Sequence, residues 1–125
     1  MICLDTNYLI KGLEKGSDEA ARIIGWYESG ESMITAMPSW YEFICGPLSE
    51  PQEATMRAFL QEIIPFDEEP ARAAAWLFNQ TGRKRHLRVD AMIAGCAMAR
   101  KAQVVTDNLK DFRLFEEWGL ELIGD

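Results

Sequence analysis

The chain has 125 residues, of which 48% are hydrophobic, so it is long enough for one domain with a core that needs no disulfide. Its formal net charge of −7 excludes a protein that grips nucleic acid through bulk positive charge. The N-terminus has neither a basic leader nor a long apolar stretch, which predicts an unprocessed cytoplasmic protein without a membrane span.

Five short apolar runs, each bounded by polar or turn residues, predict strands. In chain order they cover Ile2–Leu4, Ser32–Thr35, Ile63–Phe66, Gln103–Thr106 and Leu120–Ile123. Helical periodicity fills the intervals, with predicted helices at 17–30, 56–63, 71–82, 90–97 and 111–118. Strands that alternate with helices predict a parallel sheet covered on both faces. The fold class is therefore a three-layer α/β/α sandwich with a central parallel sheet of about five strands, in a single domain over residues 1–125.

Two acids follow predicted strands directly. Asp5 comes after the first strand and Asp107 after the fourth. In an open α/β sheet, ligands bind outside the carboxyl ends of the strands, so both carboxylates are candidates for one site. A helix cap or a turn is the alternative role for each, since Asp is favoured in both.

Two further acids lie at the starts of predicted helices. Ser39 and Glu42 have the spacing of a capping box, and Asp90 stands where an N-cap residue would. Taken alone, capping explains each of them. Four acids distributed over separate element boundaries are better explained by one cluster, and clustered carboxylates are ligands for Mg²⁺ or Mn²⁺.

Polar and basic residues flank these acids. Thr6 and Asn7 follow Asp5, Thr106 and Asn108 flank Asp107, and such groups orient water or contact phosphate oxygens. The segment before Asp90 carries the candidate RNA-binding residues Arg83, Lys84, Arg85 and Arg88. A solvated loop is the alternative reading of this segment.

The helix around Glu42 presents an apolar stripe, and we expect this stripe to be buried. It comprises Met37, Tyr41, Ile44, Cys45 and Leu48. Tyr41 is expected in the core, while Trp40 is open between the core, a nucleobase and a partner protein. All three cysteines are expected to be reduced core residues.

Three sequence segments carry a family resemblance. Leu4-Asp5-Thr6-Asn7, Val89-Asp90-Ala91-Met92-Ile93-Ala94-Gly95 and Val104-Val105-Thr106-Asp107-Asn108, with Asp111-Phe112 beyond, resemble the PIN-domain nucleases. The length resembles that of the VapC-type toxins of type II toxin–antitoxin systems. By this resemblance Asp5, Glu42 and Asp90 match the three acidic positions of the family. The fourth position stays open between Asp107, which we favour, Asn108 and Asp111.

The resemblance implies a Mg²⁺- or Mn²⁺-dependent endoribonuclease that forms a homodimer. It also implies a cognate VapB-like antitoxin that inhibits the enzyme and carries it to operator DNA. The expected mechanism has metal at Asp5 and Asp90 activating a water for in-line attack on an RNA phosphodiester, with Glu42 and Asp107 completing the site. The alternative is a noncatalytic PIN-like module that binds protein or RNA.

Overall fold

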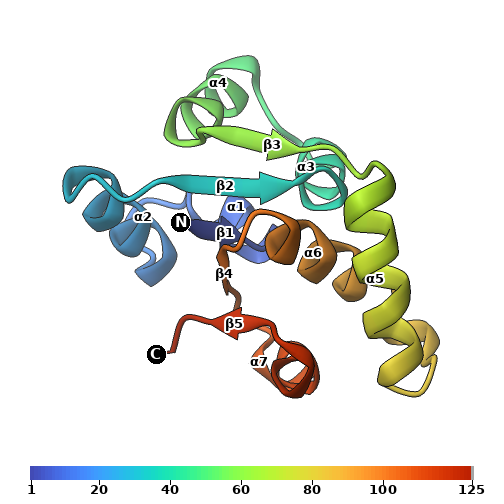
Figure 1. Ribbon diagram of the computed structural model, residues 1–125. Coiled ribbons are helices and arrows are strands. Elements are labelled where there is room, and N and C mark those ends of the chain that lie inside the picture. Colours follow the sequence, from blue (N-terminus) through green and yellow to red (C-terminus); the bar gives the residue numbers. More distant parts are fainter. Residues whose placement is uncertain (125) are drawn as a thin grey trace.

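A computed structural model describes residues 1–124, which contain a five-stranded sheet with all neighbouring strands parallel (Figure 1). The strands are β1 (Ile2–Leu4), β2 (Met33–Ala36), β3 (Glu62–Ile64), β4 (Gln103–Val105) and β5 (Glu121–Leu122). Their spatial order is β3-β2-β1-β4-β5, which places β1 in the centre. The connection from β1 runs to β2 on one side, whereas the connection from β4 runs to β5 on the other side, so the carboxyl ends of β1 and β4 form a topological switch point. Ligands of open α/β sheets bind at such points.

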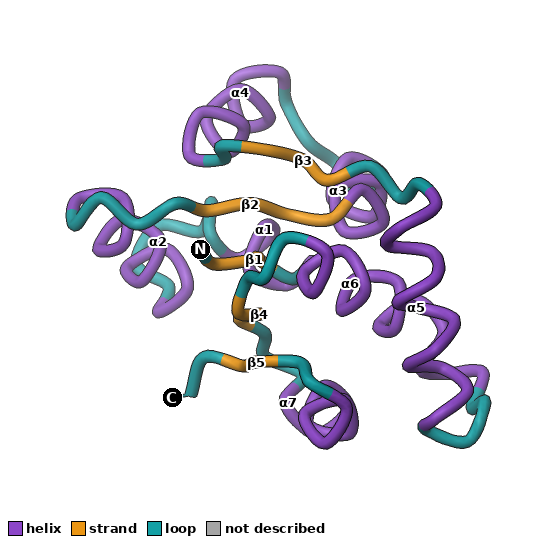
Figure 2. The backbone as a smooth tube through the Cα atoms, in the orientation of Figure 1, coloured by secondary structure: helices purple, strands orange, loops and turns teal. Residues whose placement is uncertain are grey.

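Helices connect the strands (Figure 2). They are α1 (Thr6–Lys11), α2 (Asp18–Glu28), α3 (Met37–Ile44), α4 (Glu50–Phe59), α5 (Glu68–Gln80), α6 (Arg88–Ala99) and α7 (Leu109–Phe112), with 3₁₀ turns η1 (Arg85–Leu87) and η2 (Arg113–Trp118). The predicted α/β/α architecture is confirmed. No helix within residues 1–124 combines the length and the apolar composition needed to cross a membrane.

Alternating side chains of the strands divide the core into two layers. On β1, Cys3 joins the cluster under α5, α6 and η2, whereas Ile2 and Leu4 join the cluster under α1 to α4. Val104 and Val105 of β4 separate in the same way. Both faces of the sheet are therefore buried, which is why its strands read as continuous apolar runs rather than as alternating ones.

Helix α6 packs closely on α5 through its small residues. A Cβ atom built on Gly95 would lie 2.6 Å from the carbonyl oxygen of Pro70 and 2.8 Å from the amide nitrogen of Ala74. The closest approach at Gly95 is therefore to the backbone of α5.

Several predicted boundaries are wrong for local reasons. The expected helix at 56–63 ends at Phe59, because Leu60 is extended and Gln61 already donates to the Met33 carbonyl at 2.8 Å. The predicted final helix is α7 followed by the 3₁₀ turn η2. Helix α1 was not predicted, and its N-cap is Asp5, whose carboxylate accepts from the amide of Thr6.

The predicted caps of α3 and α6 are also wrong. Helix α3 begins at Met37 with Ala36 as N-cap, and the Oγ of Ser39 is buried without a hydrogen-bond partner. The capping box belongs to α4, between Ser49 and Gln52. Helix α6 begins at Arg88, so Asp90 lies within its first turn and not at its N-cap. Glu42 and Asp90 are therefore free of the capping roles that local sequence suggested.

The apolar stripe of α3 that was predicted to be buried is exposed. Met37, Tyr41 and Ile44 are 42%, 64% and 43% exposed, whereas Trp40 and Phe43 face the sheet and are buried. Both sets of residues have helical spacing. The set with the larger rings, Trp40 and Phe43, packs in the core beneath the sheet. Cys45 is also exposed, while Cys3 and Cys96 are buried as expected.

Candidate active site at the carboxyl edge of the sheet

Asp5 is the buried centre of the candidate site, with only 4% of its surface exposed. One carboxylate oxygen, Oδ1, accepts from the amide of Thr6 at 2.8 Å. The other, Oδ2, accepts from the Thr106 hydroxyl at 2.6 Å and from the Asn7 side chain at 3.4 Å. Burial raises the pKa of Asp5 above its ordinary value, against the lowering effect of the Thr106 and Thr6 hydrogen bonds. Asp5 thus caps α1, ties β1 to β4 and keeps lone pairs for a further ligand.

Glu42 reaches the same edge from α3. Its Oε1 accepts from the Thr6 hydroxyl at 2.8 Å, which links the first turn of α1 to the middle of α3. The carboxylate is one of the charges that raise the pKa of both Asp5 and Asp90. Because Glu42 is exposed and does not cap its own helix, one carboxylate oxygen remains available.

Asp90 lies in the first turn of α6 among other acids. Burial raises the pKa of Asp90 to about 7, and repulsion from Asp5, Asp111 and Glu42 adds to this effect. Within residues 1–124 Asp90 forms no ion pair with Lys, Arg or His. Its negative charge is therefore uncompensated, which is the electrostatic condition that a bound cation relieves.

The loop after β4 divides its acids between two sides of the site. Asp107 accepts a 3.3 Å hydrogen bond from the Lys11 ammonium, and its amide donates to Asn7 at 3.2 Å. Asn108 instead donates to Asp90 at 3.3 Å and to Asp111 at 3.1 Å. The fold therefore brings Asp111 next to Asp90, while Asp107 is paired with a lysine.

The basic segment before α6 is exposed at all of its charged positions. The guanidinium groups of Arg83 and Arg88 lie 5.5 and 5.2 Å from the ring centroid of Phe78, and Arg83 also bonds Asn79. His86 Nε2 lies 3.8 Å from Asp111 Oδ1. The segment thus borders the Asp111 side of the acids, although two of its arginines are stacked on α5.

The acids fit a hard divalent cation that keeps part of its water shell. No three His, Cys, Asp or Glu side chains in residues 1–124 are arranged to enclose a metal ion on their own. Mg²⁺ is commonly held by one or two carboxylates together with waters and substrate phosphate, so a complete protein cage is not required. The oxygen donors and the uncompensated charge at Asp90 suit this mode of binding.

Sequence reasoning missed one residue of the candidate site, Lys11, and underrated another, Asp111. Lys11 was not considered, and the only available signal was a basic residue six positions after the first acid. Asp111 was considered only as a third choice for the fourth acidic position. The geometry of the 106–111 loop decides both points, because Lys11 pairs with Asp107 and Asn108 holds Asp111 beside Asp90.

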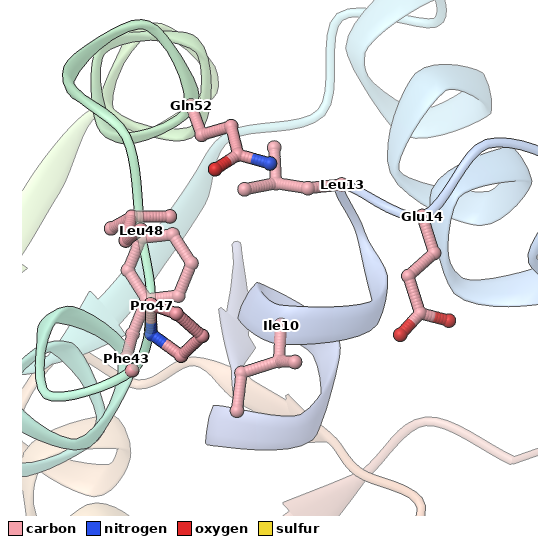
Figure 3. A pocket seen from close by; sticks show the side chains of 8 residues that line it. Ile10, Leu13, Glu14, Phe43, Pro47, Leu48 and Gln52 are labelled. Carbon is pink, nitrogen blue, oxygen red and sulfur yellow. The ribbon is translucent and has the colours of Figure 1, made fainter.

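Two apolar hollows are each lined in part by residues of α3. One, of about 240 Å³, lies between α1 and the start of α4, and in Figure 3 Ile10 and Leu13 face Phe43, Pro47 and Leu48 across it. A neighbouring hollow shares Leu13 and Glu14 with it and extends to Ile24 and Phe59. The other hollow, of about 420 Å³, is lined by Met37, Pro38, Tyr41, Glu42, Phe66, Val89 and Met92. Each is an apolar surface large enough to receive side chains of another protein.

The class of protein follows from a comparison with known families: the model of the PIN domain matches residues 2–116. The chain therefore belongs to the PIN domain family, as the sequence motifs predicted. A search of curated proteins returned no significant match.

Solved structures of similar fold come from toxin–antitoxin systems. A Klebsiella pneumoniae toxin–antitoxin complex is 27% identical, covers 90% of both chains and has a TM-score of 0.68. VapBC2 from Rickettsia felis, bound to a DNA fragment from its promoter, is 20% identical, covers 98% of both chains and has a TM-score of 0.72. FitAcB from Neisseria gonorrhoeae is 21% identical, covers 99% of this chain and 97% of that one, and has a TM-score of 0.71. These matches establish the fold of the whole described domain.

Proposed function

We propose that this chain is a VapC-like toxin, a Mg²⁺- or Mn²⁺-dependent endoribonuclease that acts in the cytoplasm. The observation that carries the proposal is the convergence of Asp5, which follows β1, with Glu42 of α3 and Asp90 of α6, while no Lys or Arg within residues 1–124 forms an ion pair with Asp90. A noncatalytic module gains nothing from such repulsion, which destabilises the fold in the absence of metal. Membership of the PIN domain family supports the same choice.

Asp5 and Asp90 are the proposed principal metal ligands, with Glu42 alongside. When bound, the metal would activate a water and neutralise the scissile phosphate. Thr6 and Thr106 hold the carboxylates of Glu42 and Asp5 in place through their hydroxyls. Asn108 does the same for Asp90 and Asp111, and this favours Asp111 over Asp107 as the fourth acid. Asp107 remains a candidate only if its contact with Lys11 breaks on metal binding.

Metal dependence tests the activity. The purified chain with MnCl₂ is expected to cut single-stranded RNA, and excess EDTA is expected to stop cleavage, which added Mn²⁺ restores. Calorimetric titration of the metal-free chain with Mn²⁺ should show binding, because the acids repel one another until a cation enters. Cleavage that continues in EDTA, or a flat titration, would exclude the metal-dependent mechanism.

A cognate VapB-like antitoxin is the proposed protein partner. Its apolar side chains would enter the hollow between α1 and α4, whose rim carries Glu14 (Figure 3). The comparison structures that contain an antitoxin support this assignment by fold. Contact with operator DNA would pass through the antitoxin, since this chain carries a net charge of −7.

The other apolar face is assigned to a homodimer. It combines the hollow beside Glu42 with the exposed side chains of Met37, Tyr41 and Ile44. A two-fold contact would set the protruding Tyr41 of each copy against the hollow of the other, as an isologous interface requires. Burial of this face would explain why large apolar side chains are exposed on α3 of the isolated chain.

The molecular mass in solution tests both assembly proposals, and two variants tell the two surfaces apart. Light scattering should give a mass near twice 14.2 kDa for the chain alone and a larger complex after addition of the cognate antitoxin. Leu13→Asp should leave the dimer and RNA cleavage intact while weakening antitoxin binding at least about tenfold, since it puts a charge in an apolar hollow. Tyr41→Asp should yield monomers and leave antitoxin binding intact. A monomeric wild-type chain, or a Leu13→Asp variant that is still fully inhibited, would refute the corresponding surface.

A further inference from the structure

Lys11 is placed at the edge of the acids by two carboxylates. Its Nζ lies 3.3 Å from Asp107 Oδ2 and 4.0 Å from Glu19 Oε2, and its side chain is 47% exposed. Asp107 in turn is fixed by the bond from its own amide to Asn7, whose side chain also reaches Asp5. The ammonium group is therefore held in position next to the site, yet it keeps donors that face solvent.

A series of contacts connects Lys11 to the acids. Lys11 contacts Asp107, the amide of Asp107 contacts Asn7, and Asn7 contacts Asp5. On the other side of the site, Asn108 bridges Asp90 and Asp111, and His86 lies beside Asp111. The Thr106 hydroxyl donates to Asp5 and accepts from the Asn108 amide, so these contacts form one series with Lys11 at one end and His86 of the basic segment 83–88 at the other.

This arrangement matters because the chain must hold a polyanion despite its net charge of −7. A bound metal ion would neutralise the scissile phosphate, but the neighbouring phosphates of the RNA would still meet a negative surface. Cations at the two ends of the acids would compensate the phosphates on either side. Within residues 1–124, Lys11 is the only Lys or Arg in an ion pair with Asp5, Glu42, Asp90, Asp107 or Asp111.

We propose that Lys11 is an RNA-positioning residue that contacts a backbone phosphate next to the scissile one, at the end of the site opposite residues 83–88. The inference rests on the proposed nuclease function and adds to it the path of the RNA strand over the surface. This path leads from the basic segment across Asp90 and Asp5 to Lys11. Lys11 takes no part in the chemical step. Its pairing with Asp107 orients the ammonium group until RNA provides a phosphate.

The test is the salt dependence of RNA binding, measured by fluorescence anisotropy with a labelled single-stranded RNA in Mg²⁺. All proteins carry Asp90→Asn so that the RNA stays intact. Lys11→Gln should weaken binding about fivefold, the effect of one exposed ionic contact. It should also reduce the slope of log Kd against log salt by about 0.7, the value for one phosphate contact on a single strand. Lys11→Arg should restore both quantities.

Lys15→Gln is the matched control, because Lys15 is an exposed lysine in the turn after α1 and forms no ion pair within residues 1–124. It removes the same charge and should leave the slope unchanged. A purely structural role for Lys11 predicts a lower unfolding temperature with an unaltered slope, and that result overturns the inference. Absence of RNA binding by every protein, together with absence of RNA cleavage by the wild-type chain in Mn²⁺, would instead refute the proposed nuclease function, and the inference with it.

Discussion

Asp90→Asn is expected to lower RNA cleavage at least about a hundredfold, because in the proposed site it removes a ligand charge from a metal that would stabilise the transition state by several kcal/mol. The same substitution is expected to stabilise the metal-free chain. Burial and the carboxylates of Asp5, Asp111 and Glu42 raise the pKa of Asp90 to about 7, so its charged form is disfavoured in the folded state. Asparagine is nearly isosteric and removes that repulsion.

The stability effect has a defined pH window. Below about pH 4 Asp90 is protonated in both the folded and the unfolded chain, so its charge costs no stability. Between that pH and about 7 the unfolded chain loses the proton first, and the folded state loses stability relative to it. Above about pH 7 Asp90 is charged in both states, and the loss of stability no longer changes with pH. Converted in full, this pKa difference would lower the free energy of unfolding by about 4 kcal/mol. Solvent screening of a partly exposed side chain reduces the effect to about 1–2 kcal/mol.

Urea unfolding at pH 5 and pH 8 in EDTA measures the effect. The wild-type chain should lose more stability than Asp90→Asn between these two pH values, and Asp18→Asn, at the exposed start of α2, should behave like the wild type. Mn²⁺ should stabilise the wild type far more than Asp90→Asn. An Asp90→Asn variant that cleaves RNA at the wild-type rate would remove Asp90 from the metal site.

Gly95→Ala is expected to destabilise the fold by about 2 kcal/mol, although alanine is the better helix former by about 1 kcal/mol. The added Cβ would come within 2.6 Å of the Pro70 carbonyl and 2.8 Å of the Ala74 amide. Both contacts are with backbone, which cannot move aside as a flexible side chain can. Helix α6 would have to shift away from α5, and Asp90 in its first turn would shift with it.

Gly25→Ala in α2 is the matched control, since a Cβ at Gly25 meets no atom within 4 Å. This variant should be more stable than the wild type by up to about 1 kcal/mol, because only the helix propensity changes. Thermal unfolding of both variants gives the comparison directly. Equal stabilisation by the two substitutions would show that α5 and α6 are not in close backbone contact at Gly95.

Much of the fold is predictable from local sequence. Apolar runs of three or four residues identify every strand to within about two residues, because a sheet covered by helices on both faces buries most of its strand residues. Asp5 and Asp107 can be assigned to the carboxyl edge of the sheet by the same reasoning. The motifs around Asp5, Asp90 and Thr106 also predicted the PIN domain family that the comparison confirms.

Local sequence failed where two roles share one spacing. Glu42 fits a capping box with Ser39, yet its partner is Thr6, which is 36 residues away. Tyr41 and Trp40 both lie on apolar stripes of α3, but only Trp40 is buried. In each case the competing alternatives have similar local energies, and contacts with distant elements decide between them.

The sequence by itself determined the parallel α/β architecture and the set of acids at strand and helix ends, because periodicity and strand polarity are local properties of the chain. Only the tertiary structure decided which of these acids meet. Packing of α3 against α1 and β2, and of α6 against α3, β2 and β4, brings Glu42 and Asp90 to Asp5, and hydrogen bonds of the 106–111 loop direct Asp111 to Asp90 and Asp107 to Lys11. Such contacts join residues up to about a hundred positions apart, so their geometry exists only after the sheet has formed.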